Sequence, residues 1–148
     1  MSFTLAPVTL RGAQASLVPL SADHGPALSE AVRDGELWRL SYTVVPHPNG
    51  MSREIDRRLA LQAAGSMLPF TVLDAEGIPV GMTTYMNIDA VHQRVEIGST
   101  WYAARVQRTA LNTECKLLLL THAFEERQCI AVEIRTHVLN AQSRRAID

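Results

Sequence analysis

The chain has 148 residues, of which 47% are hydrophobic and 20% are charged, and its formal net charge is -1 at pH 7. This length and composition are typical of one soluble domain, residues 1–148, with a sizeable core. The near-zero net charge argues against nucleic acid or an anionic membrane as a partner. No apolar run approaches the ~20 residues that a membrane span needs.

The two cysteines and five histidines follow no spacing that is typical of a metal site. Cys115 and Cys129 both lie in apolar segments and outside any CxxC motif. This predicts reduced, buried thiols in a cytoplasmic protein, and a disulfide between them is the alternative. The N-terminus has no basic region followed by a long apolar run, so the sequence predicts no secretory signal.

In the first half of the chain, turn residues separate short periodic segments. Residues 8–20 predict two short strands, and a helix follows that ends before Gly35. Residues 36–50 contain prolines and an Asn-Gly pair and are predicted to be irregular. The next helix, "REIDRRLALQAA", has Ser52 as its candidate N-cap. Its first part mixes charges of both signs and is interpreted as a solvated helix face.

The second half begins with strand-like periodicity. Residues 69–102 predict three strands, with a hairpin turn at Asp74–Gly77. A leucine-rich helix from about Asn112 to Glu126 follows, then a strand at Cys129–Thr136 and the opening of another helix. The order β-β-α-α-β-β-β-α-β-α is typical of an α/β or α+β fold with a sheet of mixed direction.

A polar loop joins the third of these strands to the leucine-rich helix. Backbone N–H groups at a helix start have no intrahelical partner, and the aligned peptide dipoles make that end positive. A strand, a tight turn and a helix N-terminus together favour anion binding, and phosphate suits such a site. The polar side chains of the loop are Arg105, Gln107, Arg108, Thr109 and Thr113. The alternative is an ordinary helix start that is capped by Asn112 or Thr113.

This loop resembles the acyl-CoA loop of the GNAT N-acetyltransferases, whose motif is Q/R-x-x-G-x-G/A at the start of a helix. The motif falls on Gln107, on Ala110 where the family has glycine, and on Asn112 where it has glycine or alanine. Three other segments resemble the family in the same order: "RVEIGSTWY" its fourth strand, "NTECKLLLLTHAFE" its helix, and "VEIRTHVLNAQSRRAI" its fifth strand and next helix. The N-terminal "LRGAQASLVPLSADHGPAL" is similar to the RimJ/RimL-like branch, which acetylates ribosomal-protein N-termini and other amines.

The resemblance implies the GNAT fold, a mixed, mostly antiparallel twisted sheet flanked by helices. The family continues through the rest of the last helix and two further strands that this sequence does not include. We therefore expect either a polypeptide that continues for roughly 40–50 residues, or a homodimer or domain-swapped pair that covers the open sheet edge. At Ala110 the family's glycine lets the backbone approach a pyrophosphate, and alanine would be costly there if the position required a positive φ.

Acetyl transfer from a thioester to an amine needs a neutral amine, donors for the developing oxyanion, a proton for the leaving thiolate, and both substrates held together. The resemblance implies that Ser143 protonates the CoA thiolate and that Asn140 contacts the pantetheine arm, and helix capping is the alternative for both. Glu96 is the candidate base, acting directly or through water. The alternative for Glu96 is a solvent-facing or arginine-paired side chain.

The resemblance also assigns residues to the two substrates. The backbone of Trp101 and Tyr102 would pair with pantetheine, while their side chains are interpreted as aromatic core. Trp38, Tyr42 and Tyr85 are candidates for the amine pocket, and a place in the core is the alternative. The predicted acetyl-CoA site comprises Trp101, Tyr102, Val106, Gln107, Arg108, Thr109, Ala110, Leu111, Asn112, Thr113 and Asn140.

The sequence therefore predicts an acetyl-CoA-dependent N-acetyltransferase. The expected acceptor is a primary amine, either a protein N-terminus, for example that of a ribosomal protein, or a small amine, and transfer is expected to be direct within a ternary complex. No metal, nucleic acid or membrane partner is expected. The alternative is a catalytically weak or inactive domain of the same fold that senses CoA or binds proteins.

Overall fold

The computed structural model describes residues 6–34, 47–126, 129 and 131–134. Within them the chain forms one six-stranded sheet in the order β1-β2-β3-β4-β5-β6. The strands are Leu10–Arg11 (β1), Ala15–Pro19 (β2), Met67–Asp74 (β3), Pro79–Asp89 (β4), Arg94–Tyr102 (β5) and Ala131–Ile134 (β6). The α-helices are Gly25–Arg33 (α1), Met51–Ala63 (α2) and Ala110–Thr121 (α3). Shorter helical turns are Ala22–His24 (η1), Pro48–Gly50 (η3), Ala104–Val106 (η4) and the π-helical turn His122–Glu126 (η5).

The sheet is mixed in direction, as predicted. Neighbouring strands are antiparallel from β1 to β5, and β5 pairs with β6 in parallel from Arg94↔Ala131 to Ile97↔Ile134. The predicted hairpin turn is confirmed, because the Gly77 N–H donates to the Asp74 carbonyl over 3.0 Å. Parallel neighbours need a crossover connection, and here α3 supplies it.

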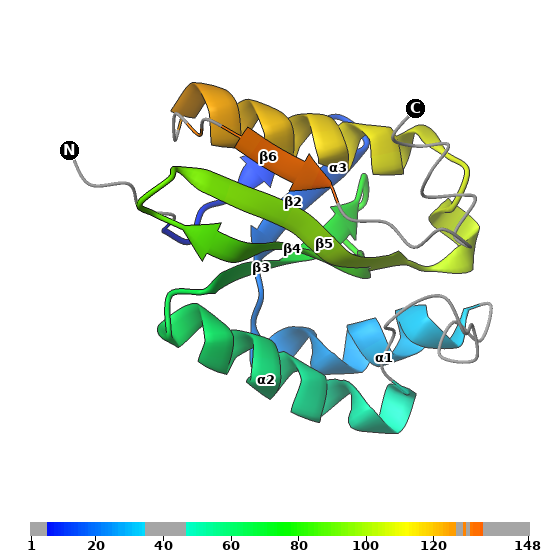
Figure 1. The fold of residues 1–148 in the computed structure, drawn as a ribbon. Helices are drawn as coiled ribbons and strands as arrows, with labels where there is room; N and C mark the ends of the chain where they lie inside the picture. Colours follow the sequence, from blue (N-terminus) through cyan, green and yellow to red (C-terminus); the bar gives the residue numbers. More distant parts are fainter. Residues whose placement is uncertain (1–5, 35–46, 127–128, 130, 135–148) are drawn as a thin grey trace.

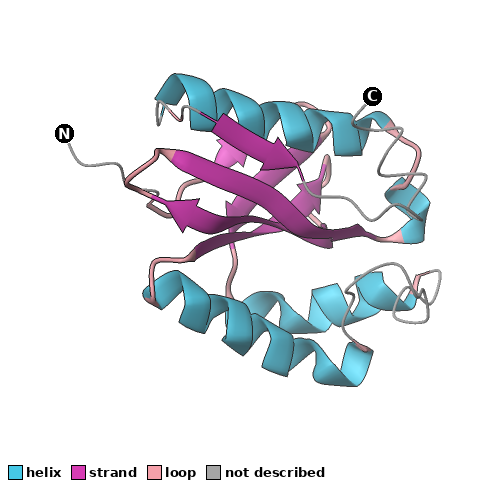
Figure 2. Cartoon of the chain, viewed as in Figure 1, coloured by secondary structure: helices cyan, strands magenta, loops and turns pink. Residues whose placement is uncertain are grey.

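Helices cover both faces of the sheet. Figure 1 shows α1 and α2 on one face and α3 on the other, and Figure 2 shows the same three layers by secondary structure. Tyr85 from β4 marks the α3 face, because its hydroxyl donates to the Leu119 carbonyl in α3. Thr84 marks the opposite face, because its hydroxyl accepts from Arg58 in α2. Alternation along this part of the strand therefore places Met86 on the same face as Thr84.

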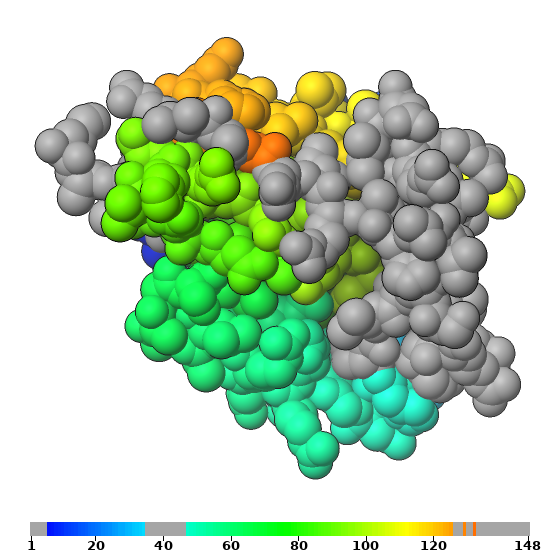
Figure 3. Space-filling model, in the orientation of Figure 1, coloured from blue at the N-terminus to red at the C-terminus, as the bar shows by residue number. Residues whose placement is uncertain are grey.

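Helix α2 packs one side against the sheet, and its outer side forms the lower surface in Figure 3. Its buried residues Met51, Ile55 and Arg58 follow the spacing i, i+4, i+7 that places side chains on one helix face. The helix begins at Met51 with Gly50 as its N-cap, so the prediction that Ser52 caps it is wrong. The interpretation of its charged start as a solvated face is correct for Arg53, Asp56 and Arg57 but wrong for Arg58, which is 0% exposed.

Helix α3 buries Leu111, Cys115 and Leu119, which recur every four residues on the side that faces the sheet. Each fully buried leucine side chain contributes about 1.5–3 kcal/mol to folding. The helix begins at Ala110 with Thr109 as N-cap, two residues before the predicted start. The α-helix ends at Thr121 and continues as the π-helical turn to Glu126.

A carboxylate from α3 ties this helix to the first hairpin. The Glu114 Oε1 atom accepts from the main-chain N–H groups of Gln14, over 2.8 Å, and Ala15, over 3.0 Å. Gly12 makes this contact possible, because a Cβ at that position would clash with the Glu114 carboxylate. The contact helps to fix α3, and hence the start of α3, relative to the sheet.

Candidate functional site

The polar loop between β5 and α3 is closed by side-chain contacts to its own backbone. The Gln107 Nε2 atom donates to the Tyr102 main-chain carbonyl over 2.9 Å. The Thr109 hydroxyl donates to the Val106 carbonyl over 2.6 Å and accepts from the Leu111 N–H over 3.3 Å. The Val106 side chain is buried and anchors the loop in the core. These contacts fix the shape of the loop.

The start of α3 presents main-chain donors. The N–H groups of the N-cap and of the first three helical residues lack intrahelical acceptors, and in α3 these three helical residues are Ala110, Leu111 and Asn112. Thr109 satisfies the Leu111 N–H, which leaves the N–H groups of Ala110 and Asn112 directed out of the helix end. Together with the positive end of the helix dipole, these groups favour an anion.

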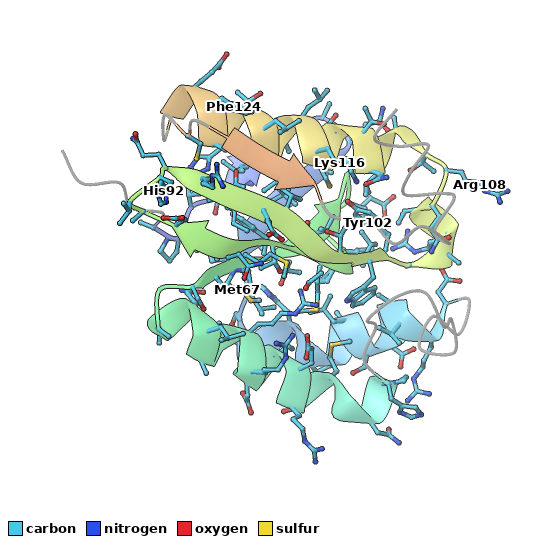
Figure 4. All side chains as sticks on the ribbon, viewed as in Figure 1. Met67, His92, Tyr102, Arg108, Lys116 and Phe124 are labelled. Carbon is cyan, nitrogen blue, oxygen red and sulfur yellow. The ribbon has the colours of Figure 1, made fainter. Side chains whose placement is uncertain are left out.

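The two arginines of the loop differ in their availability. The Arg105 Nη2 atom lies 3.2 Å from Asp74 Oδ2, so its charge is largely offset by that carboxylate. The Arg108 side chain is exposed and extends outward from the loop in Figure 4, and no ion pair of Arg108 is found within the described part of the chain. Arg108 is therefore the cation that can approach a bound phosphate.

The backbone of the motif tolerates a side chain at Ala110. The non-glycine residues with positive φ are Asn87, Gln93, Ser99 and Arg108. Ala110 is not among them, so its methyl group costs no left-handed backbone strain. The left-handed position of this loop is Arg108, with φ 62°.

Asn112 lies inside the first turn of α3 and does not cap it. Its Oδ1 atom accepts from the Lys116 Nζ atom over 2.9 Å, and Thr109 is the capping residue. The capping role that the sequence left open for Asn112 or Thr113 is therefore wrong. Thr113, one residue further on, is exposed.

The side chains that end β5 belong to the core. Trp101 is buried at 4% exposure. Burial raises the pKa of the Tyr102 hydroxyl and of the Cys115 thiol, that of Cys115 to about 12. Figure 4 shows Tyr102 between β5 and α3. The side chains therefore occupy the core, as interpreted from the sequence, and the main chain is the part of this segment that can contact a ligand.

Glu96 lies on β5 but not beside the loop. It pairs with Met86 of β4, which places it on the α1–α2 face of the sheet, and it is half-buried. Six residues separate it from Tyr102, about 20 Å along an extended strand. Glu96 is therefore not part of the anion site, and its role as a base stays a prediction.

Tyr85, a candidate for the amine pocket, is 0% exposed. Its ring packs edge-on against Phe70 and stacks on His122. This placement favours the alternative, a residue of the core. The other predicted positions, Trp38, Tyr42, Asn140 and Ser143, lie outside the described residues.

One group that sequence reasoning missed is the buried guanidinium of Arg58. Its Nη1 atom donates to the Ser99 carbonyl over 3.1 Å and to the Thr84 hydroxyl over 3.0 Å. The i, i+4 spacing of Glu54 and Arg58 was the available signal, because a paired arginine on the apolar side of a helix can be buried. No group of three or more His, Cys, Asp or Glu residues that could hold a metal occurs in the described ranges. None of the helices described here is long and apolar enough to cross a membrane.

The fold and this loop define a class of protein: a mixed sheet whose crossover helix begins with main-chain donors at the end of a polar loop. The chain belongs to the acetyltransferase (GNAT) domain family, whose model matches residues 15–148. A comparison with curated proteins gives no match.

Solved structures of the same fold support this assignment. A GCN5-related N-acetyltransferase from Brucella melitensis is 26% identical, with a TM-score of 0.80, and the match covers 97% of this chain and 66% of that one. Mycobacterium smegmatis RimJ in complex with CoA-disulfide is 20% identical, with a TM-score of 0.78 and coverage of 95% and 72%. RimL, a ribosomal L7/L12 alpha-N-protein acetyltransferase, is 16% identical, with a TM-score of 0.81 and coverage of 96% and 78%. RimJ and RimL share the fold of this chain, and the family identifies the chain as an acetyl-CoA-dependent N-acetyltransferase.

Proposed function

We propose that this chain moves the acetyl group of acetyl-CoA onto a primary amine, a protein N-terminus or a small amine, while both substrates are bound. The observation that carries the proposal is the start of α3, where the N–H groups of Ala110 and Asn112 have no intrahelical acceptor. Arg108 adds an exposed cation beside them. These groups fit the pyrophosphate of CoA, because helix N-termini bind phosphate through such donors.

When bound, acetyl-CoA supplies the acetyl group as an activated thioester. The part of this chain is to hold and orient it. The α3 start binds the phosphates, and main-chain groups of Trp101 and Tyr102 at the end of β5, with Asn140, are proposed to contact the pantetheine arm. Holding two reactants in a productive arrangement lowers a barrier by as much as about 7–11 kcal/mol.

Two side chains are proposed to move protons. Ser143 would donate a proton to the departing thiolate, and Glu96 would accept one from the amine, directly or through water. Trp38 and Tyr42 are proposed to line the amine pocket. A free α-amino group titrates near ~8 and lysine near ~10.4, so a larger fraction of N-terminal amines is neutral at neutral pH. An N-terminal amine therefore depends less on a base to remove its proton.

A protein N-terminus is the acceptor that we favour. The RimL neighbour is named as an alpha-N-protein acetyltransferase, which supports this choice. We also propose that the protein is a cytoplasmic, bacterial enzyme and that it forms a homodimer. Light scattering on the purified chain tests the homodimer. The non-catalytic alternative has no support among the comparisons.

A panel of three acceptors tests the proposal. It comprises a peptide with a free N-terminus and no lysine, the same peptide with a blocked N-terminus and one lysine, and a polyamine, each incubated with acetyl-CoA and followed by mass spectrometry. We expect the free N-terminus to be acetylated first. Acetylation of the lysine or the polyamine alone would show that the acceptor is not a protein N-terminus. Acetylation of no amine would favour the non-catalytic alternative.

A further inference from the structure

Arg58 is a cation that is completely removed from solvent between α2 and the sheet. It is 0% exposed. Its Nε atom donates to Glu54 Oε2 over 2.7 Å, while its Nη1 atom reaches across to β4 and β5, to the Thr84 hydroxyl and the Ser99 carbonyl. Its Nη2 atom has no hydrogen-bond partner within the described part of the chain.

This arrangement is costly for the fold. Removing a guanidinium from water has a large desolvation penalty, and one carboxylate and two neutral acceptors return only part of it. Replacing a buried ion pair by apolar side chains is often neutral or stabilising. Stability alone therefore gives a poor account of an arginine at this position, and its contacts on β5 indicate a different role.

The contact on β5 is made to a bulge. Thr84 pairs with Gly98 and Met82 pairs with Trp101, so Thr83 alone lies opposite two residues, Ser99 and Thr100. This is the two-against-one count of a β-bulge. Ser99 has φ 50°, a left-handed conformation that costs a non-glycine residue about 1–2 kcal/mol. The conformation directs the Ser99 carbonyl to Arg58 on the α2 side.

The hydrogen bond to Ser99 also orients the next N–H group. In a trans peptide the carbonyl and the following N–H point in opposite directions, and this chain has no cis peptide among its described residues. Because Arg58 holds the Ser99 carbonyl toward α2, the Thr100 N–H points away from α2. The peptide lies beyond the last described pair of β5 and β6, Ile97↔Ile134, and before Tyr102, where the loop contact begins.

We propose that Arg58 is a positioning residue of the transferase: it fixes the orientation of the Ser99–Thr100 peptide, so that main-chain groups of β5 are aligned for the acetyl-transfer step. This inference rests on the proposed function for its catalytic consequence. Its structural part, the orientation of one peptide by a buried guanidinium, stands independently of any activity.

The test compares Arg58→Met with Arg57→Met and Arg58→Lys. Methionine keeps much of the side-chain volume and removes every donor. Arg57 is the matched control, because it is the adjacent arginine, it also binds Glu54 over 2.8 Å, and its side chain is 48% exposed. Lysine keeps the positive charge and one donor group.

We expect Arg58→Met to lower kcat about tenfold or more with less than about a threefold change in KM for acetyl-CoA, whereas Arg57→Met keeps both near wild type. Arg58→Lys should recover part of kcat. Crystal structures of the variants should show Ser99 leaving the left-handed region in Arg58→Met only. If Arg58→Met does not fold, the crystal structure of Arg58→Lys decides: Ser99 kept in the left-handed region with no donor from residue 58 on its carbonyl overturns the proposal, whereas a retained contact together with retained kcat supports it.

A folded Arg58→Met protein with wild-type kcat, or with Ser99 unchanged, would also overturn it. If the wild-type chain acetylates no amine, the proposed function fails. The conformation of Ser99 in the variant structures then still decides whether Arg58 orients the peptide.

Discussion

The Gln107 side chain donates to the Tyr102 main-chain carbonyl over 2.9 Å, and this bond closes the loop that leads to the start of α3. The first residue of the acyl-CoA motif thus acts on the loop itself. It joins the end of β5 to the residues just before α3. The bond sets where the N–H groups of Ala110 and Asn112 lie relative to the sheet.

Replacing Gln107 by alanine should weaken acetyl-CoA binding. The loop would lose the contact that fixes its shape. Part of the binding free energy would then offset the entropic cost of ordering the loop. We expect the Kd for acetyl-CoA to rise about three- to tenfold, measured by isothermal titration calorimetry, with little change in Tm. Thr121→Ala, an exposed position at the other end of α3, is the control. Equal affinities for the two variants would contradict the role given to Gln107.

Arg108 adopts a left-handed conformation with φ 62°, so glycine should be tolerated there better than alanine. Arg108→Gly and Arg108→Ala remove the same charge, but only alanine retains a Cβ that disfavours this φ. We expect the glycine variant to be more stable by up to about 1 kcal/mol in denaturant unfolding. At Arg53, exposed in α2, the order should reverse, because glycine costs about 1 kcal/mol in a helix. If the same residue, glycine or alanine, gave the more stable variant at both positions, backbone strain at Arg108 would be ruled out.

Both Arg108 variants should also bind acetyl-CoA more weakly than the wild type, and by similar factors, because each loses the exposed cation. The loss should shrink as salt is added, since an exposed charge is screened within about 10 Å at 0.1 M ionic strength. Wild-type affinity in both variants would remove Arg108 from the site.

The buried thiol of Cys115 predicts a loss of stability in alkali. Its pKa is raised from 9.0 to about 12 by burial, so the unfolded chain releases this proton at a lower pH than the folded chain. The stabilisation is fully present below pH 9.0 and is lost as the pH rises toward about 12. The free energy of unfolding should fall by up to about 1.4 kcal/mol per pH unit in that window. Cys115→Ala should reduce the slope but not abolish it, because the pKa of Tyr102 is raised as well. An unchanged slope in Cys115→Ala would contradict this origin.

Ser143→Ala should lower kcat more than it raises KM for acetyl-CoA, if Ser143 protonates the departing thiolate. The loss should be smaller for acyl donors whose leaving thiol is more acidic, because such a thiolate needs a proton less. A kcat equal to that of the wild type would leave Ser143 with the role of a helix cap.

Most of the fold was predictable because its signals are local. Alternating strands, the Asp74–Gly77 turn and the leucine spacing of α3 each fix an element within a few residues. The sequence predicts the start of α3 two residues too late, because Asn112 and Thr109 are both residue types that favour the N-cap position. The choice between them depends on the turn before the helix, where Thr109 also binds the Val106 carbonyl.

The burial of Arg58 was not predictable in the same way. Its charged neighbours resemble those of an exposed helix face. Its location depends on Ser99, 41 residues further along the chain. A bulge in a distant strand creates the acceptor, and the Glu54–Arg58 spacing within α2 does not reveal that acceptor.

The central claim, that the start of α3 holds the pyrophosphate of acetyl-CoA, is tested most directly by a crystal structure of the full chain grown with acetyl-CoA. We expect phosphate oxygens within hydrogen-bonding distance of the main-chain N–H groups of Ala110 and Asn112. The claim would be contradicted if the phosphates bound at any other place on the molecule. It would also be contradicted if crystals grown at saturating acetyl-CoA showed no phosphate at the start of α3.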